Sequence, residues 1–370
     1  MESKINYVSL NEISTIQTGK KDANYGDKGG EYPFFTCADK PILSPTYSFD
    51  GESIILPGNG ANVGMVFYHV GKFEAYQRTY VLNNIKCNSR YLFHHLSAYW
   101  KKFNLSKQFG SATNYIRMQN FLDYTIPLPP IASQRRIADI LDKADEIIRK
   151  RKEAIALTEQ LQKSIFLDMF GDPVTNPKGW EKVTVNDVVS EVKDGPHVSP
   201  EYSHNGIPIL STRNIRPNEL IMEDIKYISE DVYLNLIKRF KPQKGDVLLT
   251  KGGTTGFAKV VDWDWNFAVW VHLALLRPNN KIRSEFLEAT LNSPNCYLQS
   301  QLYTHGIANK DLGLNRIRKI KMCLPPLDLQ DEYCQIRKKT LFLLNKNKKS
   351  LKESENLFNS LLQKAFKGEL

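Results

Sequence analysis

The sequence predicts an α+β fold in which two globular domains are joined by two long antiparallel helices that form a coiled coil, with a pseudo-two-fold internal repeat. Two observations carry this prediction. A Leu-Pro-Pro run at 128–130, followed by Gln134, returns at 324–326, followed by Gln330, and such self-similarity indicates a duplicated module. The chain of 370 residues also exceeds the length that one core normally supports.

The duplication continues along both copies. Matching pairs at the same offset are Gly110 and Gly306, Lys150 and Lys346, Leu161 and Leu357, and Phe170 and Phe366. Near the start of the copies, residues 8–13 match residues 183–188, and these two segments lie closer together in the sequence. The second copy therefore holds about twenty more residues inside its globular part.

The first domain is expected over residues 1–130. Alternating apolar residues between Gly, Asn and Pro turns predict strands over 47–56, 64–70 and 79–85. The aromatic residues over 91–103 have helical spacing. This mixture indicates an α+β domain.

A long spacer helix is predicted over residues 131–171, because neither Gly nor Pro occurs there before Gly171 and the apolar residues step by three and four. A second domain over 172–326 and a C-terminal spacer helix over 327–370 repeat this order. Two helices of equal length that each close a copied module favour pairing with each other. A surface helix packed on its own domain is the alternative.

The net charge of +10 favours a polyanionic partner, but charge alone does not separate nucleic acid from a membrane surface or from a charge that serves solubility. Five cysteines without a Cys-x-x-Cys pair fit neither a disulfide framework nor a zinc site. The N-terminus is polar, and no run reaches the length of a membrane span, so we expect a cytoplasmic protein that contacts no membrane.

Three motifs resemble the DNA-specificity (S) subunit of type I restriction-modification systems. They are the runs at 128–138, 164–173 and 357–370. The resemblance covers the whole chain and implies two target recognition domains, each of which reads one half of a bipartite double-stranded DNA sequence. It implies that the antiparallel helix pair sets the distance between the half-sites. Two methyltransferase (M) subunits and restriction (R) subunits are the implied protein partners.

The resemblance also implies that the chain binds no cofactor, and that S-adenosylmethionine, ATP and Mg are held by the partner subunits. Positions shared by both copies become candidates for subunit docking. These candidates are Gln134, Arg135, Phe170, Gln330 and Phe366. The charge at the helix start differs between the copies, because Arg135-Arg136 is replaced by Asp331-Glu332.

The sequence contains no catalytic or metal-binding motif that we recognise, so we expect a non-enzymatic chain. The run Lys251-Gly252-Gly253-Thr254-Thr255-Gly256 lacks the Lys-Ser/Thr of a phosphate-binding loop. The adjacent His94 and His95 are expected to pack or lie on the surface rather than bind metal. Two alternatives remain open at this point, namely a self-sufficient restriction or methylation enzyme and a coiled-coil adaptor without DNA contact.

Each copy contains a glycine loop suited to reading base edges, at 57–62 and 251–255. Asn side chains can pair with adenine through two hydrogen bonds, and cations neutralise phosphates. An ordinary hairpin turn is the alternative, but the copies keep the glycines while the polar residues change, which favours readout. The loops after Gly110 and Gly306 fit readout and a structural turn equally well.

The candidate DNA contacts are Lys20, Lys21, Asn59, Asn62, Arg78, Asn114, Tyr115 and Arg117 in the first copy, and His197, Arg213, Asn214, Lys251, Thr254, Thr255, Lys259, His272, Asn309 and Lys310 in the second.

Overall fold

The computed structural model describes residues 6–105, 107, 114–306 and 310–370. The chain forms two compact units. The first unit contains Met1–Ile155 and Asn347–Leu370, and the second contains Ala156–Lys346. Each of the two long helices, α4 (Ile131–Phe170) and α10 (Leu327–Lys367), therefore contributes residues to both units.

The first unit is built on a four-stranded antiparallel sheet. Its strands stand in the order β2 (Thr15–Thr18), β8 (Thr79–Asn83), β5 (Glu52–Pro57) and β6 (Phe67–Val70). A three-stranded sheet of β4 (Ile42–Ser44), β3 (Tyr32–Phe35) and β7 (Glu74–Ala75) and the pair β1 (Tyr7–Ser9) with β9 (Thr125–Pro127) complete it. The predicted strands over 64–70 and 79–85 correspond to β6 and β8. The one predicted over 47–56 begins later, at Glu52, as β5.

Helix α2 (Ser89–Leu105) confirms the helix predicted over 91–103 and supplies much of the first core. Its Trp100 and Leu92 are fully buried, and they share a cluster with Ile54 of β5 and with Phe121 of the short helix α3 (Met118–Leu122). Burying one such large apolar side chain stabilises a fold by about 1.5–3 kcal/mol. The remaining short helices are α1 (Leu10–Ile13) and the 3₁₀ turn η1 (Ala23–Tyr25).

The second unit repeats the sheet arrangement of the first. Its four-stranded sheet has the order β11 (Val189–Asp194), β19 (Leu273–Pro278), β16 (Val247–Thr250) and β17 (Ala258–Val260). The three-stranded sheet is β15 (Lys226–Ile228), β12 (Ile207–Leu210) and β18 (Ala268–Val269), and β10 (Glu181–Thr184) pairs with β20 (Lys321–Leu324). In both units the last strand of the three-stranded sheet runs parallel to its neighbour. The internal repeat is thus confirmed at the level of strand order.

The additional residues of the second copy form two insertions. The connection after β3 is short, at 36–41, but the equivalent connection after β12 spans 211–225 and contains η2 (Thr212–Asn214) and the hairpin β13 (Ile215–Arg216) with β14 (Glu219–Leu220). The next connection contains α6 (Glu230–Ile237). Ser229 begins this helix by accepting a hydrogen bond from the Val232 amide, as N-cap serines do.

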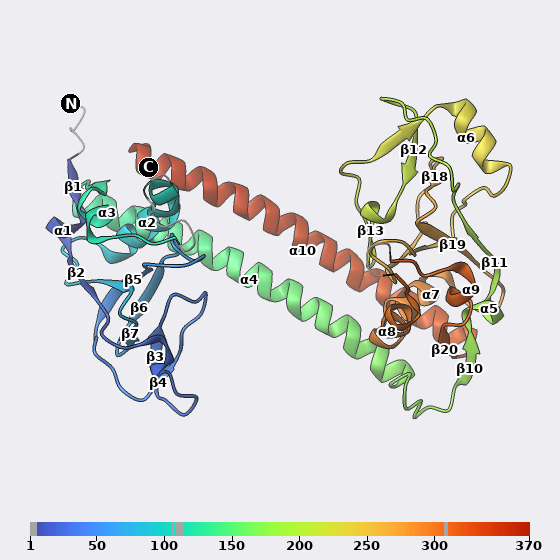
Figure 1. Ribbon diagram of the computed structural model, residues 1–370, viewed down its shortest axis with the longest axis horizontal. Helices are drawn as coiled ribbons and strands as arrows, with labels where there is room; N and C mark the ends of the chain where they lie inside the picture. The colour runs from blue at the N-terminus through green and yellow to red at the C-terminus, as the bar shows by residue number, and fades with distance from the viewer. Residues whose placement is uncertain (1–5, 106, 108–113, 307–309) are drawn as a thin grey trace. The chain divides into compact units, whose positions relative to one another are not determined.

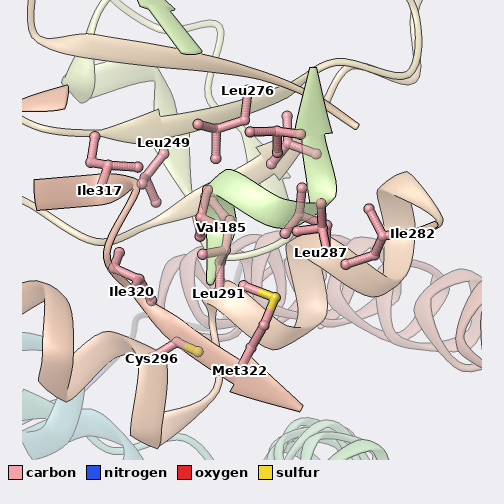
Figure 2. Close-up of a cluster of buried hydrophobic side chains, with 14 of the residues drawn as sticks. Val185, Leu249, Leu276, Ile282, Leu287, Leu291, Cys296, Ile317, Ile320 and Met322 are labelled. Carbon is pink, nitrogen blue, oxygen red and sulfur yellow. The ribbon is translucent and has the colours of Figure 1, made fainter. Parts of the chain in front are cut away.

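The core of the second unit lies between its main sheet and helix α7 (Ser284–Leu291). Figure 2 shows Leu249 and Leu276 from the sheet on one side and Leu287 and Leu291 from α7 on the other, all fully buried. Val185, the first residue of α5 (Val185–Val188), lies among them. Helices α8 (Pro294–Tyr303) and α9 (Leu314–Ile317) add Cys296 and Ile317 to the same cluster.

The two long helices (Figure 1) begin at the predicted residues, Ile131 and Leu327, and end at Phe170 and Lys367, before the predicted ends at 171 and 370. The carbonyls of Pro130 and Pro326 accept the first helical bonds, at 3.1 Å each, from the amides of Gln134 and Gln330. Both helices end before a glycine with positive φ, which is +76° at Gly171 and +79° at Gly368. Such a left-handed residue favours glycine and stops a helix.

Within each unit, the segments of the two helices run antiparallel. In the first unit Lys152 of α4 lies 3.2 Å from Glu355 of α10, while Ile137 shares a core cluster with Ala365. Residues that lie later in α4 therefore contact residues that lie earlier in α10. In the second unit the amide of Gln162 donates to Thr340 over 3.2 Å, and the ring of Phe166 meets that of Tyr333 at 5.7 Å.

Candidate nucleic-acid interface

In the first unit, three loops meet at the end of the main sheet where β5 stops and β8 starts. The Gly58 amide donates to the carbonyl of Arg78 over 2.9 Å, and the Ile116 amide donates to Gly58 over 2.9 Å. The Gly60 amide donates to the carbonyl of Asn114 over 2.8 Å. Residues 58–62, 76–78 and 114–117 therefore form one surface, and together with 19–21 we call them the first loop cluster.

Segment 19–21 lies against this surface because a glycine permits a very close approach. A Cβ on Gly19 would sit 1.8 Å from the carbonyl oxygen of Ala75. The Gly19 amide donates to Thr79 over 3.2 Å, and the Lys21 carbonyl accepts from the Gln77 amide over 2.9 Å. Since the backbone is fixed here, Lys20 and Lys21 are placed beside the turn that contains Arg78.

The candidate residues of the first copy thus converge on one loop cluster. Lys20, Arg78, Asn114 and Arg117 are exposed there, and Asn59 is half-buried. Asn62 is half-buried as well, and its amide donates to the Cys37 carbonyl over 2.8 Å, which anchors the glycine loop to the loop after β3. The Arg117 guanidinium donates to the Tyr115 hydroxyl over 2.8 Å. The surface therefore combines cations, amides and an aromatic ring, which are the groups that DNA contacts require.

The second unit contains an equivalent set of loops. The Lys251 amide donates to His272 over 2.8 Å, the Leu312 amide donates to Lys251 over 2.7 Å, and the Gly253 amide donates to Lys310 over 3.0 Å. These bonds reproduce those of Gly58 and Gly60 in the first unit. Residues 195–197, 251–256, 270–272 and 310–313 form what we call the second loop cluster. Gly195 is the counterpart of Gly19, and a Cβ on it would likewise sit too close to a carbonyl oxygen, 2.0 Å from that of Val269.

Two lysines predicted to contact DNA in the second copy are instead buried and paired. The Lys251 ammonium lies 3.5 Å from Asp194 and 3.2 Å from Asp311. The ammonium of Lys259, which lies on β17, is 2.7 Å from Asp262 in the loop that follows this strand. An ammonium withdrawn from water is stable only with such carboxylate partners, so it is not available to neutralise a phosphate. The DNA contacts predicted for both lysines are therefore wrong.

Two further candidates of the second copy are interior polar groups. Thr255 is buried, and its hydroxyl lies 2.9 Å from that of Thr304. Asn214 is buried, and its amide accepts from Ser211 over 2.9 Å and donates to Ile221 over 3.0 Å. These bonds support loops rather than a ligand, which corrects the readout role predicted for both residues.

The other candidates of the second copy remain predictions. His197, Arg213, Thr254, His272 and Lys310 are exposed in the structure, whereas Asn309 lies outside the described residues. Arg213 does not belong to the second loop cluster as defined. It lines a pocket of about 70 Å³ together with Tyr202, Lys226 and Trp270.

The two glutamines predicted to dock partner subunits are buried and hold their own units together. The Gln134 side chain accepts from the Asn88 amide over 2.9 Å and donates to the Pro129 carbonyl over 2.7 Å. Gln330 repeats this pattern with Arg283 over 2.8 Å and Pro325 over 2.8 Å. A buried amide whose atoms are already bonded offers no docking surface, so the predicted docking role is corrected to a structural one.

The two phenylalanines also pack within units, whereas Arg135 is exposed. Phe170 is buried with its ring 4.9 Å from that of Phe286, and half-buried Phe366 lies 4.7 Å from the His95 ring. Both rings are therefore engaged in core contacts, and a docking role for their buried faces is ruled out. The docking role of Arg135 stays a prediction.

Sequence reasoning missed the carboxylates of the second loop cluster. Asp194 and Asp311 lie 3.5 and 3.2 Å from the Lys251 ammonium, yet they are far from it in the sequence. Sequence reasoning also missed why an aspartate stands at 331, where the first copy has Arg135. Arg283 binds Asp331 through two hydrogen bonds of 2.6 and 2.8 Å, while its counterpart in the first copy, Asn88, carries no charge. Only the paired change at 283 and 331 could have indicated this.

Residues 2–157 and 177–357 match the family described as the type I restriction modification DNA specificity domain. The chain belongs to this family. Among curated members, it is 35% identical over 156 residues to the type I restriction enzyme EcoDI specificity subunit of Escherichia coli, which covers 42% of this chain and 34% of that protein. It is 25% identical over 319 residues to the EcoBI specificity subunit of Escherichia coli, covering 77% of this chain and 66% of that protein.

Solved structures of this family share the fold. The type I restriction-modification S subunit from M. genitalium superposes with a TM-score of 0.69 at 16% identity, over 99% of this chain and 97% of that chain. A chain from a study of complex assembly and conformational transition of the type I R-M system gives a TM-score of 0.52 at 19% identity, over 100% of both chains. At these identities, the likeness concerns the fold alone.

In the described part of the chain, no helix is long and apolar enough to cross a membrane. Across those same residues, no group of His, Cys, Asp and Glu side chains is arranged to hold a metal ion. The cysteines are free thiols, and burial raises the pKa of Cys296 to about 12 and that of Cys87 to about 11. Both thiols therefore stay protonated and unreactive at neutral pH.

Proposed function

We propose that this chain is the specificity subunit of a type I restriction-modification complex, and that each loop cluster reads one half of a bipartite double-stranded DNA sequence. The observation that carries the proposal is the shared backbone framework of the two clusters. The bonds of Gly58 and Gly60 recur at Lys251 and Gly253, although the side chains around them differ. A constant framework with variable side chains suits two sites of one kind that read different bases.

The exposed groups of the first loop cluster support contact with both bases and phosphates. Lys20, Arg78 and Arg117 can neutralise phosphates, and Asn59 and Asn114 can pair with base edges in the major groove. The net charge of +10 favours DNA over an uncharged partner. The second loop cluster is less cationic because its buried Lys251 is paired with carboxylates.

We propose that the catalytic steps belong to partner subunits. Two methyltransferase subunits would bind S-adenosylmethionine, and restriction subunits would use ATP and Mg, while this chain supplies the DNA sequence preference. Arg135, which is exposed at the start of α4, is the candidate docking contact that the fold leaves accessible. Membership of the family supports this division of labour.

The test is a map of methylated bases in DNA from cells that carry the chain with its methyltransferase subunits. We expect one bipartite motif with a fixed spacing. Asn59→Ala should relax or change the bases of one half and leave the other half intact, whereas the control Asn315→Ala, on an exposed residue of α9, should leave both halves unchanged. Methylation that ignores sequence, or methyl transfer and DNA cleavage by the purified chain alone, would contradict the proposal.

A further inference from the structure

The carboxylate of Asp311 occupies a fixed position in the second loop cluster. Its Oδ1 lies 3.2 Å from the Lys251 ammonium, and its Oδ2 lies 3.1 Å from the Arg316 guanidinium. The backbone of Asp311 exchanges two hydrogen bonds with His305, of 2.8 and 3.0 Å. Both the main chain and the side chain of Asp311 are therefore held in place before any ligand arrives.

The same carboxylate remains accessible from outside. The Asp311 side chain is 48% exposed, whereas the Lys251 side chain beneath it is 7% exposed. A carboxylate offers about four acceptor positions, and the two cations occupy one on each oxygen. The acceptor positions of the carboxylate that face outward can therefore accept further hydrogen bonds, whereas an ionised carboxylate donates none.

Lys251 acts as the support for this acceptor. It stands between Asp311 and the buried Asp194, so one ammonium fixes two carboxylates. In the first unit Gly58 takes the place of Lys251, and Tyr115 takes the place of Asp311. Tyr115 forms a backbone bridge with Asn59, just as Asp311 forms one with Gly252. At this position the two loop clusters thus present different chemistry on one framework, a phenol in the first unit and a carboxylate in the second.

We infer that Asp311 is a specificity-determining residue, which accepts a hydrogen bond from the exocyclic amino group of a cytosine or an adenine in one half-site. This inference rests on the proposed function. A carboxylate accepts hydrogen bonds and is repelled by phosphates, so an exposed carboxylate in a DNA-binding surface favours contact with a base edge that donates. In the major groove, the N4 amino group of cytosine and the N6 amino group of adenine are those donors.

The experiment uses the full chain in complex with its methyltransferase subunits and a duplex that carries the recognised sequence. Each cytosine is replaced in turn by 2-pyrimidinone and each adenine by purine, so that single exocyclic amino groups are removed. For the wild-type chain we expect a loss of affinity of roughly tenfold or more at one position of the half-site that the second loop cluster reads. The analogue that produces the loss identifies the base as cytosine or adenine.

Asp311→Ala removes both acceptor oxygens, so it should abolish the sensitivity to that one analogue and keep the discrimination of the other half-site. The matched control is Asp264→Ala, since Asp264 is an exposed aspartate of the same unit that pairs with Lys244 over 2.9 Å, outside the loop cluster. It should behave as the wild type. If Asp311→Ala does not fold, Asp311→Glu keeps the charge for Lys251 while it moves the carboxylate, and it should lose the same discrimination.

An Asp311 variant that folds and discriminates every analogue as the wild type does would overturn the inference and leave the proposed function intact. A wild-type complex without sequence preference in either half would instead contradict the proposed function, and the inference with it. The two failures are therefore distinguishable.

Discussion

Arg337 of α10 donates a hydrogen bond of 2.6 Å to Glu288 of α7, and both side chains are buried. The first unit also has an ion pair between its long helix and its globular part, but at other positions of the repeat and with the charges exchanged. There the long helix α4 supplies the carboxylate of Asp142, which binds Arg90 of α2 and lies 2.7 Å from the His94 ring. In each unit a buried or half-buried ion pair thus attaches the globular part to a long helix, and the sign of the charge on the long helix differs between the units.

Glu288→Ala should strongly destabilise the second unit. The substitution leaves the Arg337 guanidinium buried without its carboxylate, which costs about 3–5 kcal/mol. Chemical denaturation of the full chain measures the loss. As a control, Glu153→Ala removes an exposed partner of Arg149 on α4 and should change the free energy of unfolding by less than about 0.5 kcal/mol. Equal effects of the two substitutions would show that the buried pair is not a major contact.

Gln330→Ala should destabilise the fold, because the Arg283 amide and the Pro325 carbonyl then lose their partner within a buried site. Leaving such groups unbonded costs about 1–3 kcal/mol. Arg135→Ala, on an exposed helix surface, should leave the unfolding midpoint unchanged and weaken methyltransferase docking. A Gln330 variant with the stability of the wild type and impaired docking would restore the original docking prediction.

Arg78→Ala should weaken DNA binding at all sequences and lower the slope of log affinity against log salt by about one, because one phosphate contact is lost. Binding titrations at several salt concentrations measure this slope. Lys86 provides the control, since it follows β8 at the opposite end from Arg78 and is also exposed. If Lys86→Ala lowers the slope as much as Arg78→Ala does, the first loop cluster is not the DNA-binding face.

The stability of the first unit should fall as the pH decreases from about 6.5 to about 3. Burial lowers the pKa of His95 to about 3, and it also lowers the pKa of His94. An unfolded histidine takes up a proton below about 6.5, so the unfolded state binds more protons throughout this window and stability rises with pH. At pH 5 the His95 contribution alone lowers the free energy of unfolding by about 2 kcal/mol relative to pH 7.5.

Urea denaturation at pH 5 and pH 7.5 measures this difference. His95→Phe removes the titrating group and should reduce the pH dependence, although the hydrogen bond of 3.1 Å to the Tyr124 hydroxyl is lost as well. His197→Phe provides a control, because His197 is exposed. A pH dependence that persists unchanged in the His95 variant would assign it to other groups.

Features encoded by local sequence could be predicted, whereas features that depend on distant partners could not. Apolar spacing and the Gly171 stop located α4, and the repeated glycines located both loop clusters. The burial of Lys251 was not predictable, because the Asp194 and Asp311 carboxylates that permit it come from separate strands and loops. Gln134 was misassigned for the same reason, since its hydrogen-bond partner Asn88 lies in another segment.

The spacing of the two half-sites should depend on the length of the two long helices, which are shared by both units. Deletion of residues 152–158 from α4 and 349–355 from α10 removes both partners of the Lys152–Glu355 ion pair and keeps the heptad register of the apolar positions. Each helix becomes shorter by about 10 Å. Since one base pair advances the duplex by about 3.4 Å, the preferred spacing should decrease by about three base pairs.

Methylation mapping with the deleted chain measures the new spacing, while the bases of each half-site should stay the same because neither loop cluster is altered. Three base pairs also turn one half-site about the duplex axis by roughly a third of a turn, so affinity at the new spacing should be lower than for the wild type. A deletion of four residues from each helix interrupts the heptad repeat instead, and it should change the local winding of the two helices. An unchanged spacing in the folded seven-residue variant would mean that the helices do not set the distance between half-sites.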